Sequence, residues 1–382
     1  MLLTGNIVQR NQAGYGKLSI QNGIIERIEL TGQCQDDANW ILPGFIDVHL
    51  HGIYNGDATP EKVHLMAQAA PQSGLTTFCP SMASDAPERM LEFVKRIREL
   101  MNNPLPGATR IAGSHLEGPY MEYVHKGGMN ENFIRMPDMQ EVEKLLEAAD
   151  GTLKIMTISP ELPNALEVTR RLTEAGVRVS GGHTGMSIDQ LDKFIQAGGQ
   201  AICHLFNTFD GRNAEYGVSM PALADAVLVD DRLFIELITD GVHVKEILLK
   251  LAIRAAGVDR IIGITDSMFG TGLPDGIYPM PDAGRTYTLK AGDVGRLTDN
   301  PDLIVGSCLT QNWAFYNLTR RFGFPVTAAS RILSGNPARY LNMDKFTGEL
   351  RTGLAADIAV LAPDYRTVKQ TFIDGQEVFN AD

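Results

Sequence analysis

Two histidines, His49 and His51, stand one residue apart in the apolar stretch 44–52, and Asp47 comes two residues before them. In an extended strand successive side chains point to opposite faces, so these three residues share one face. Neutral imidazole nitrogens are common ligands of divalent metals. The pair at the end of an apolar strand therefore predicts a metal site, for which other segments must supply further ligands.

Four more ligand-type side chains follow other short apolar stretches, and imidazole with carboxylate suits Zn²⁺, Fe²⁺ or Mn²⁺. The predicted ligands are His49, His51, Glu117, His183, His204 and Asp266. A lone histidine in a strand or helix is more often a satisfied core residue, which is our interpretation of His115 and His64. Cys203 directly precedes His204, so strand alternation predicts that its thiol faces away from the site.

Short apolar strands alternate with helical stretches through the middle of the chain, and this pattern must bring the ligands together. The eight candidate strands are 44–52, 76–82, 109–120, 153–161, 177–185, 200–207, 234–243 and 260–268. Eight strand–helix units predict an α/β fold, a (β/α)8 TIM barrel with its chemistry at the carboxyl ends of the strands. A doubly wound sheet is the alternative, but no GxGxxG motif follows the first strand.

At both ends of the chain, unlike the middle, the sequence pattern is typical of β-strands. Asn22-Gly23 and Asp374-Gly375 are hairpin signals between alternating runs. We therefore expect residues 1–42 and 345–382 to form a small β-sandwich domain beside a barrel domain of residues 43–344.

Composition and charge bear on whether the protein binds nucleic acid, crosses a membrane or forms disulfides. The net charge is -12, and no basic stripe indicates a nucleic-acid partner. No apolar run reaches the ~20 residues of a membrane span, and the start lacks signal-peptide features. The four cysteines include no CxxC pair, which favours reduced thiols and a cytoplasmic location.

Several motifs carry a resemblance to a known family. "LPGFIDVHLHG", followed by the later carboxylate, the two single histidines and "TDS", resembles the amidohydrolase superfamily. More narrowly, "HLEGPY", "GGHTG", "HLFNTF", "TDGVHV" and "GSCLT" resemble N-acetylglucosamine-6-phosphate deacetylases. The resemblance covers essentially the whole chain, and it implies a metal-dependent barrel hydrolase.

The resemblance also implies roles for the residues of the site. The principal metal ligands by this comparison are Glu117, His183 and His204. Asp266 matches the catalytic carboxylate, and His49 and His51 match the ligands of a second metal that some members have. We therefore expect a divalent metal cofactor, with two ions per chain.

Substrate contacts follow from the same resemblance. His243 matches a substrate-contacting histidine that assists catalysis, and Asn207 and Thr208 match the stretch that meets the sugar phosphate. The family's phosphate-binding Arg-Glu-Pro-Gly stretch is missing, and Arg212 is the nearest arginine. Met129 stands where relatives place His or Gln. Because the family's arginine often comes from a partner subunit, a homodimer is expected.

The expected activity is hydrolysis of the N-acetyl amide of an N-acetylhexosamine 6-phosphate, of glucosamine or galactosamine type. One alternative is another amidohydrolase acting on an unphosphorylated N-acyl or cyclic amide substrate, which the altered phosphate stretch favours. Another is a non-catalytic binding protein that keeps the barrel. The presence of Asp266 and of every predicted ligand counts against that second alternative.

Overall fold

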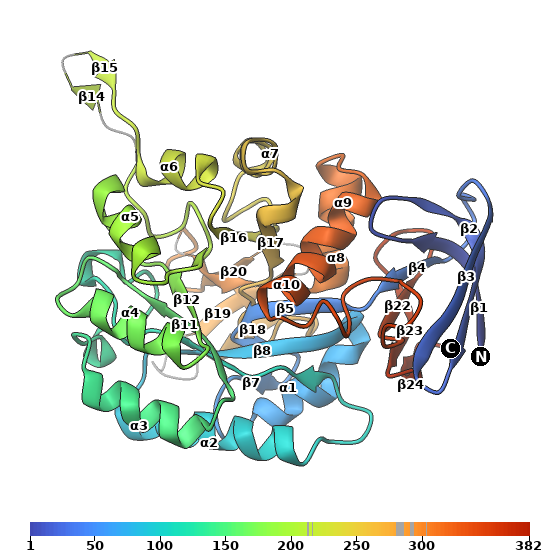
Figure 1. Ribbon diagram of the computed structural model, residues 1–382, viewed down its shortest axis with the longest axis horizontal. Helices are drawn as coiled ribbons and strands as arrows, with labels where there is room; N and C mark the ends of the chain where they lie inside the picture. Colours follow the sequence, from blue (N-terminus) through green and yellow to red (C-terminus); the bar gives the residue numbers. More distant parts are fainter. Residues whose placement is uncertain (212–213, 216, 280–285, 291–293, 303) are drawn as a thin grey trace.

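The computed structural model describes residues 1–211, 214–215, 217–279, 286–290, 294–302 and 304–382. It consists of a barrel wrapped by helices and a separate sheet at one side, where both chain termini lie (Figure 1). Residue Arg212 lies outside the described residues.

The barrel is built from eight parallel strands that occupy all eight predicted segments. In ring order they are β5 (Phe45–Leu50), β8 (Leu75–Ala83), β10 (Ser114–Glu117), β11 (Leu153–Ile158), β12 (Arg178–Gly181), β13 (Ala201–Ile202), β16 (Phe234–Ile238) and β17 (Ile261–Ile264). The short β9 (Arg110–Ile111) also pairs with β8. The ring closes where the Asp266 amide donates to the His49 carbonyl at 2.9 Å. All carboxyl ends thus meet at one mouth.

Helices cover the outside of the barrel. They are α1 (Val63–Ala69), α2 (Pro87–Asn102), α3 (Met139–Ala149), α4 (Ala165–Glu174), α5 (Ile188–Gln196), α6 (Leu223–Val229), α7 (Glu246–Ala256), α8 (Gln311–Tyr316), α9 (Val326–Ser330) and α10 (Asn336–Tyr340). In α2, Met90, Phe93 and Ile97 are buried at helical spacing, which fixes its inner face. Among the described residues, no helix is long and apolar enough to cross a membrane.

The two chain ends form one seven-stranded sheet. Its order is β24 (Gln376–Asn380), β23 (Val368–Ile373), β22 (Ile358–Leu361), β4 (Trp40–Pro43), β1 (Leu2–Val8), β2 (Ala13–Gln21) and β3 (Ile24–Gly32). Both predicted hairpin turns are present, and all four of their residues have positive φ, as a type I′ turn requires. The sheet has its own core, which includes Ile7, Leu18 and Phe372. The predicted fold class, a TIM barrel with a sandwich domain from the chain ends, is confirmed.

An inserted sheet follows the last barrel strand and was not predicted from the sequence. It contains β18 (Gly276–Pro279), β19 (Thr286–Leu289), β20 (Val294–Leu297) and β21 (Ile304–Ser307). Tyr287 of β19 packs with Met268 and Cys308 in a small core of its own. Smaller pairs are β6 (Gly52–Ile53) with β7 (Gly56–Asp57), and β14 (Ala214–Glu215) with β15 (Val218–Ser219), which projects from the barrel (Figure 1).

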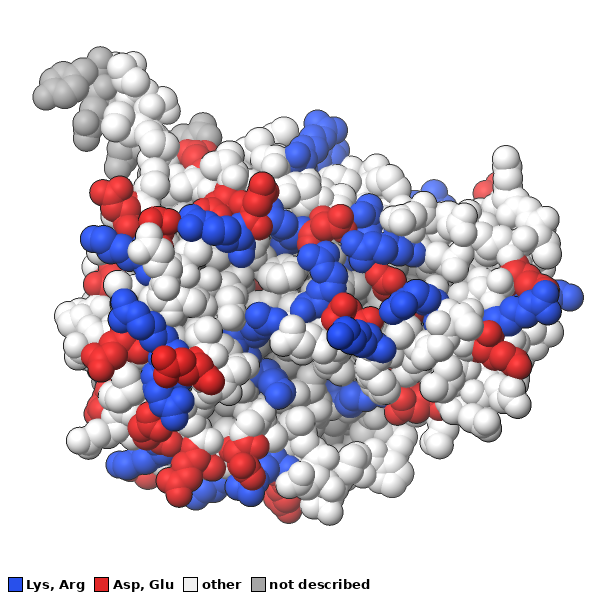
Figure 2. Space-filling view, viewed as in Figure 1, with Lys and Arg blue, Asp and Glu red and all other residues white. Residues whose placement is uncertain are grey.

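Basic and acidic side chains are interspersed over the face shown in Figure 2. Exposed ion pairs such as Arg171 with Glu143 and Arg98 with Asp150 join charges of opposite sign on the protein surface. Neither sign of charge dominates that face, so the face has no extended positive potential that would attract a polyanion.

One buried carboxylate joins the two domains. Asp357, which directly precedes β22, accepts hydrogen bonds from Arg110 in β9 at 2.7 Å, from the Thr347 hydroxyl at 2.7 Å and from the Asp374 amide at 2.9 Å. The Asp357 side chain is fully buried, and that of Arg110 is 21% exposed. The pair therefore holds the barrel against the terminal sheet in a setting that water screens poorly.

Asp357→Ala removes this carboxylate and leaves Arg110 without its buried partner. We expect the free energy of unfolding to fall by about 3 kcal/mol, measured by urea denaturation. The matched control is Lys369→Ala, which breaks an exposed pair with Asp382 and should cost less than about 1 kcal/mol. Equal effects of the two changes would contradict the role assigned to Asp357.

Candidate active site

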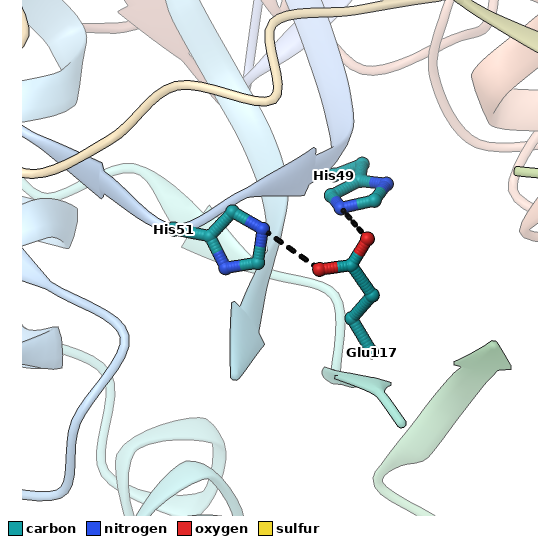
Figure 3. A group of neighbouring side chains, drawn as sticks. All are labelled: His49, His51 and Glu117. Atoms are coloured by element: carbon teal, nitrogen blue, oxygen red, sulfur yellow. Dashed lines mark ion pairs between the residues drawn. The ribbon is translucent and has the colours of Figure 1, made fainter. Parts of the chain in front are cut away.

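The carboxylate of Glu117, at the end of β10, lies at the centre of a cluster of imidazoles. Its Oε1 is 3.0 Å from Nε2 of His204, 3.2 Å from Nε2 of His183 and 3.3 Å from Nε2 of His49. Its Oε2 is 3.1 Å from Nε2 of His51. Figure 3 shows His49 and His51 directed at the two oxygens of Glu117.

Asp266 completes the cluster from beyond the end of β17. Its Oδ1 lies 3.2 Å from Nε2 of His51 and 3.5 Å from Nε2 of His49. The Asp266 side chain is 19% exposed whereas that of Glu117 is 5% exposed, so Asp266 borders the open side. The structure thus brings all six predicted ligand residues together. That they coordinate a metal stays a prediction.

Three residues of the cluster have an unusual backbone conformation. The φ angles are +49° at His183, +24° at His204 and +46° at Asp266. A non-glycine residue with positive φ costs of order 1–3 kcal/mol, and such strain gathers at functional sites. At each position the chain has just left a barrel strand, so strand alternation no longer determines where the side chain points.

Charge within the cluster explains its pKa values. Burial alone would raise the pKa of Glu117, but the facing imidazoles hold it well below its usual range. Burial alone would lower the pKa of His51, but hydrogen bonds to Asp266 and Glu117 raise it to about 9. Burial would also lower the pKa of His49, but the neighbouring Cys203, Glu117 and Asp266 raise it well above its ordinary value. The buried carboxylates therefore favour positive charge at this point, a condition that a divalent cation meets.

The donor atoms also fit a divalent metal by distance. Two ligand atoms that each lie about 2.0–2.2 Å from one ion are at most about 4.4 Å apart. The nitrogen–oxygen separations of 3.0–3.5 Å in the cluster satisfy this limit. Nε2 of His49 is buried without a hydrogen-bond partner among the described residues, as expected of a nitrogen that needs another ligand. The residues present therefore fit the predicted cofactor.

Glu236, which sequence reasoning missed, orients His49. It lies fully buried on β16, and its Oε2 is 3.1 Å from Nδ1 of His49. A carboxylate on Nδ1 fixes the tautomer that leaves Nε2 free for a ligand. His183 is held similarly, because its Nδ1 donates to the His125 carbonyl at 2.8 Å. The signal available in the sequence was a single carboxylate inside the apolar strand "FIELI".

Two neighbours of the cluster have supporting roles. The nitrogens of His115 bond the hydroxyls of Ser81 at 2.8 Å and Thr157 at 2.9 Å. Burial holds the pKa of His115 well below its ordinary value. The hydrogen bonds and burial of His115 thus fit our interpretation of this histidine as a satisfied core residue. Asp47 accepts a hydrogen bond from Thr265 at 2.6 Å, and burial raises its pKa to about 6.

The prediction that Cys203 faces away from the site is wrong. Its Sγ lies 3.6 Å from Nδ1 of His49 and 4.0 Å from Oε1 of Glu117. The β13 ladder ends at Ile202 and His204 has positive φ, so alternation does not apply at this point. Consecutive side chains therefore both reach the cluster.

His243 lies in the turn that follows β16. Its Nδ1 is 2.6 Å from Oδ2 of Asp240, and Oδ1 of Asp240 accepts the backbone amides of Val242 and His243. This carboxylate fixes the imidazole and supports a proton on Nδ1.

Asn207 and Thr208 lie in the turn after β13. The side-chain nitrogen of Asn207 is buried without a hydrogen-bond partner among the described residues. The carbonyl of Thr208 accepts the Thr184 amide at 3.2 Å. Met129 accepts the Ser84 hydroxyl through sulfur at 3.3 Å. Arg212 falls among the residues that the structure does not describe.

Comparison with known proteins adds independent evidence. The profile of the amidohydrolase family matches residues 214–378. The crystal structure of N-acetyl-D-glucosamine-6-phosphate deacetylase from Mycobacterium smegmatis is 31% identical, with a TM-score of 0.87 over 99% of this chain and 100% of that one. This chain belongs to the N-acetylglucosamine-6-phosphate deacetylase family of amidohydrolases. The predicted resemblance is confirmed, and with it the class of metal-dependent amide hydrolase.

Two further relatives in the family bear on the substrate. N-acetylgalactosamine-6-phosphate deacetylase from Escherichia coli O157:H7 is 29% identical over 365 residues, which is 94% of each chain. A structure of a mutant of the Mycobacterium smegmatis deacetylase is in complex with N-acetyl-D-glucosamine-6-phosphate. It is 29% identical, with a TM-score of 0.87 over 100% of this chain and 99% of that one.

Changing both His49 and His51 to alanine tests whether they hold a second metal. We expect metal content, measured by elemental analysis, to fall by about one equivalent per chain, because Glu117, His183 and His204 still offer one set of ligands. The control is His64→Ala in α1, which should keep the full content. Unchanged stoichiometry together with a lower melting temperature would instead assign the pair a structural role.

Proposed function

We propose that this protein hydrolyses the N-acetyl amide of an N-acetylhexosamine 6-phosphate, releasing acetate and the amino sugar phosphate, in amino sugar catabolism. The observation that carries the proposal is the convergence of Glu117 with four imidazoles and Asp266 at the mouth of a barrel of this family. Glucosamine is the first candidate sugar. Galactosamine is the second, because one relative is named for that epimer.

A divalent ion held by this cluster would supply the electrophilic part of the chemistry. When bound, the ion lowers the pKa of water towards about 7 and polarises a carbonyl oxygen. Glu117 suits a site of two ions, because both of its oxygens face imidazoles: Oε1 faces His49, His183 and His204, and Oε2 faces His51. We infer two ions per chain, of zinc, iron or manganese type.

Asp266 has the position and charge of a general base. Burial would raise its pKa, but the imidazoles of His49 and His51 hold that pKa well below its usual range. It therefore stays a carboxylate at neutral pH and can accept a proton from the attacking water. The same proton, delivered to the amide nitrogen, lets a neutral amine leave.

Two side chains near the mouth suit substrate contacts. His243, braced by Asp240, can donate a hydrogen bond to the acetyl carbonyl or a sugar hydroxyl. The unpartnered amide nitrogen of Asn207 offers a buried donor that a sugar or phosphate oxygen would satisfy. Thr208 follows in the same turn, and its unusual φ of +60° is a further sign of a specialised conformation.

A homodimer and a cytoplasmic location complete the proposal. Val218 on the projecting hairpin, Val229 on α6 and Ile247 on α7 are exposed apolar side chains suited to a second copy of the chain. The four cysteines, all within the described residues, form no disulfide, which fits a reducing compartment.

Asp266→Asn tests the base. The change keeps the shape but removes the proton acceptor, so kcat should fall by at least about 10²-fold. Metal content should stay near normal, because five other ligand residues remain. The measurement is turnover of N-acetylglucosamine 6-phosphate beside elemental analysis. More than a tenth of the original turnover would mean that another group moves the proton.

Arg212→Ala tests recognition of phosphate. In a chain of net charge -12, a phosphate needs a dedicated cation, so KM for the 6-phosphosugar should rise several-fold. The KM for the unphosphorylated sugar should not change. Equal effects on both substrates would refute the role. The same samples give the oligomeric state by sedimentation, and an active species that is strictly monomeric would contradict the dimer.

A further inference from the structure

The thiol of Cys203 lies beneath the cluster, fully buried. Its Sγ is 4.0 Å from Oε1 of Glu117, the same oxygen that His183 and His204 approach from other sides. It is also 3.6 Å from Nδ1 of His49. The sulfur therefore approaches the atom around which the donor groups of this centre gather.

The backbone around Cys203 leaves room for the thiol in this position. Its amide donates to the Gly181 carbonyl at 3.0 Å, which anchors the residue just past β13. A Cβ on Gly182 would lie 2.7 Å from Cβ of Cys203 and 2.9 Å from a methyl group of Thr157. Any larger residue at position 182 would therefore push the cysteine away from the cluster.

We propose that Cys203 is a metal ligand of this centre, acting as a thiolate on the ion held by Glu117 and His204. One ligand atom from each of these three buried residues lies within 4.8 Å of the others. With zinc–sulfur near 2.3 Å and zinc–oxygen near 2.0–2.2 Å, a sulfur and an oxygen on one ion are at most about 4.5 Å apart. The observed 4.0 Å satisfies that limit.

Other buried groups at the same place point to a bound cation. Nε2 of His49 and Oε1 of Glu236 are both fully buried without hydrogen-bond partners among the described residues. A thiol is a weak hydrogen-bond donor and would satisfy neither of them well. As the sulfur–metal bond forms, the thiol proton passes to bulk water, and the thiolate brings one more negative charge to the ion.

Cys79 provides a contrast within the same barrel. It is also fully buried, but it packs among apolar side chains such as Ile46, Val48 and Ile155. A thiol in that setting fills space and has no ligand role. Cys79→Ser is therefore the matched control for Cys203→Ser, because both changes replace a buried sulfur by a hydroxyl on a barrel strand or just after one.

A sulfur ligand changes which metals the centre prefers. Thiolate is softer than imidazole or carboxylate, so it favours zinc and cadmium over manganese. The inference rests on the proposed metal centre but not on the identity of the sugar.

The test uses the purified chain loaded with Co²⁺, read by absorption spectroscopy. The unchanged protein and Cys79→Ser should show both the visible bands of bound cobalt and a near-ultraviolet thiolate-to-cobalt charge-transfer band. Cys203→Ser should keep the visible bands and lose the charge-transfer band. Visible bands without charge transfer in the unchanged protein, or a charge-transfer band that persists in Cys203→Ser, would overturn the assignment. No cobalt uptake at all would overturn the metal centre itself.

Metal affinity gives a second readout. Cys203→Ser and Cys203→Ala should both weaken Cd²⁺ binding by at least about tenfold, and Mn²⁺ binding by clearly less. Melting curves establish that each variant is folded, and the smaller alanine variant serves if serine is poorly tolerated. An equal loss for both metals would assign Cys203 to packing.

Discussion

The buried carboxylate of Glu117 is the interaction on which the rest of the site depends. A carboxylate removed from water is unfavourable unless positive charge surrounds it. Four imidazoles provide that environment, two from β5 and its end and one each from the ends of β12 and β13, with every contact near 3 Å. The arrangement requires a closed barrel, because an open sheet would separate the first strand from the last. The bond from the Asp266 amide to the His49 carbonyl closes the ring at the site itself.

The scaffold around this carboxylate is specialised in ways that cost stability. Positive φ at His183, His204 and Asp266 is unfavourable for side chains of this size. Glu236 is a second buried carboxylate, held against His49. Such features persist only where the surrounding structure fixes them, and the tightly hydrogen-bonded barrel does so. These features lower the stability of the fold, but they set the geometry of the cluster before any ligand binds.

Recognition of the substrate is organised differently from the chemistry. The groups that would move protons and hold metal stand at strand ends, where the barrel fixes them. The groups suited to a sugar, such as Asn207 and His243, stand in the turns that follow, where sequence can vary without disturbing the barrel. The inserted sheet β18–β21 follows Asp266 along the chain. Relatives of this chain are named for different hexosamines.

The sequence by itself determined the architecture and the six clustered residues, because barrel strands place their carboxyl ends together whatever their side chains are. Alternation within a strand then predicted the shared side of His49 and His51. Only the tertiary structure decided the role of Glu236 and the direction of Cys203. Glu236 meets His49 across the barrel, a contact that no local pattern encodes. Cys203 departs from alternation because β13 ends at Ile202 and the chain turns at His204, and its contact with His49 joins segments far apart in the sequence.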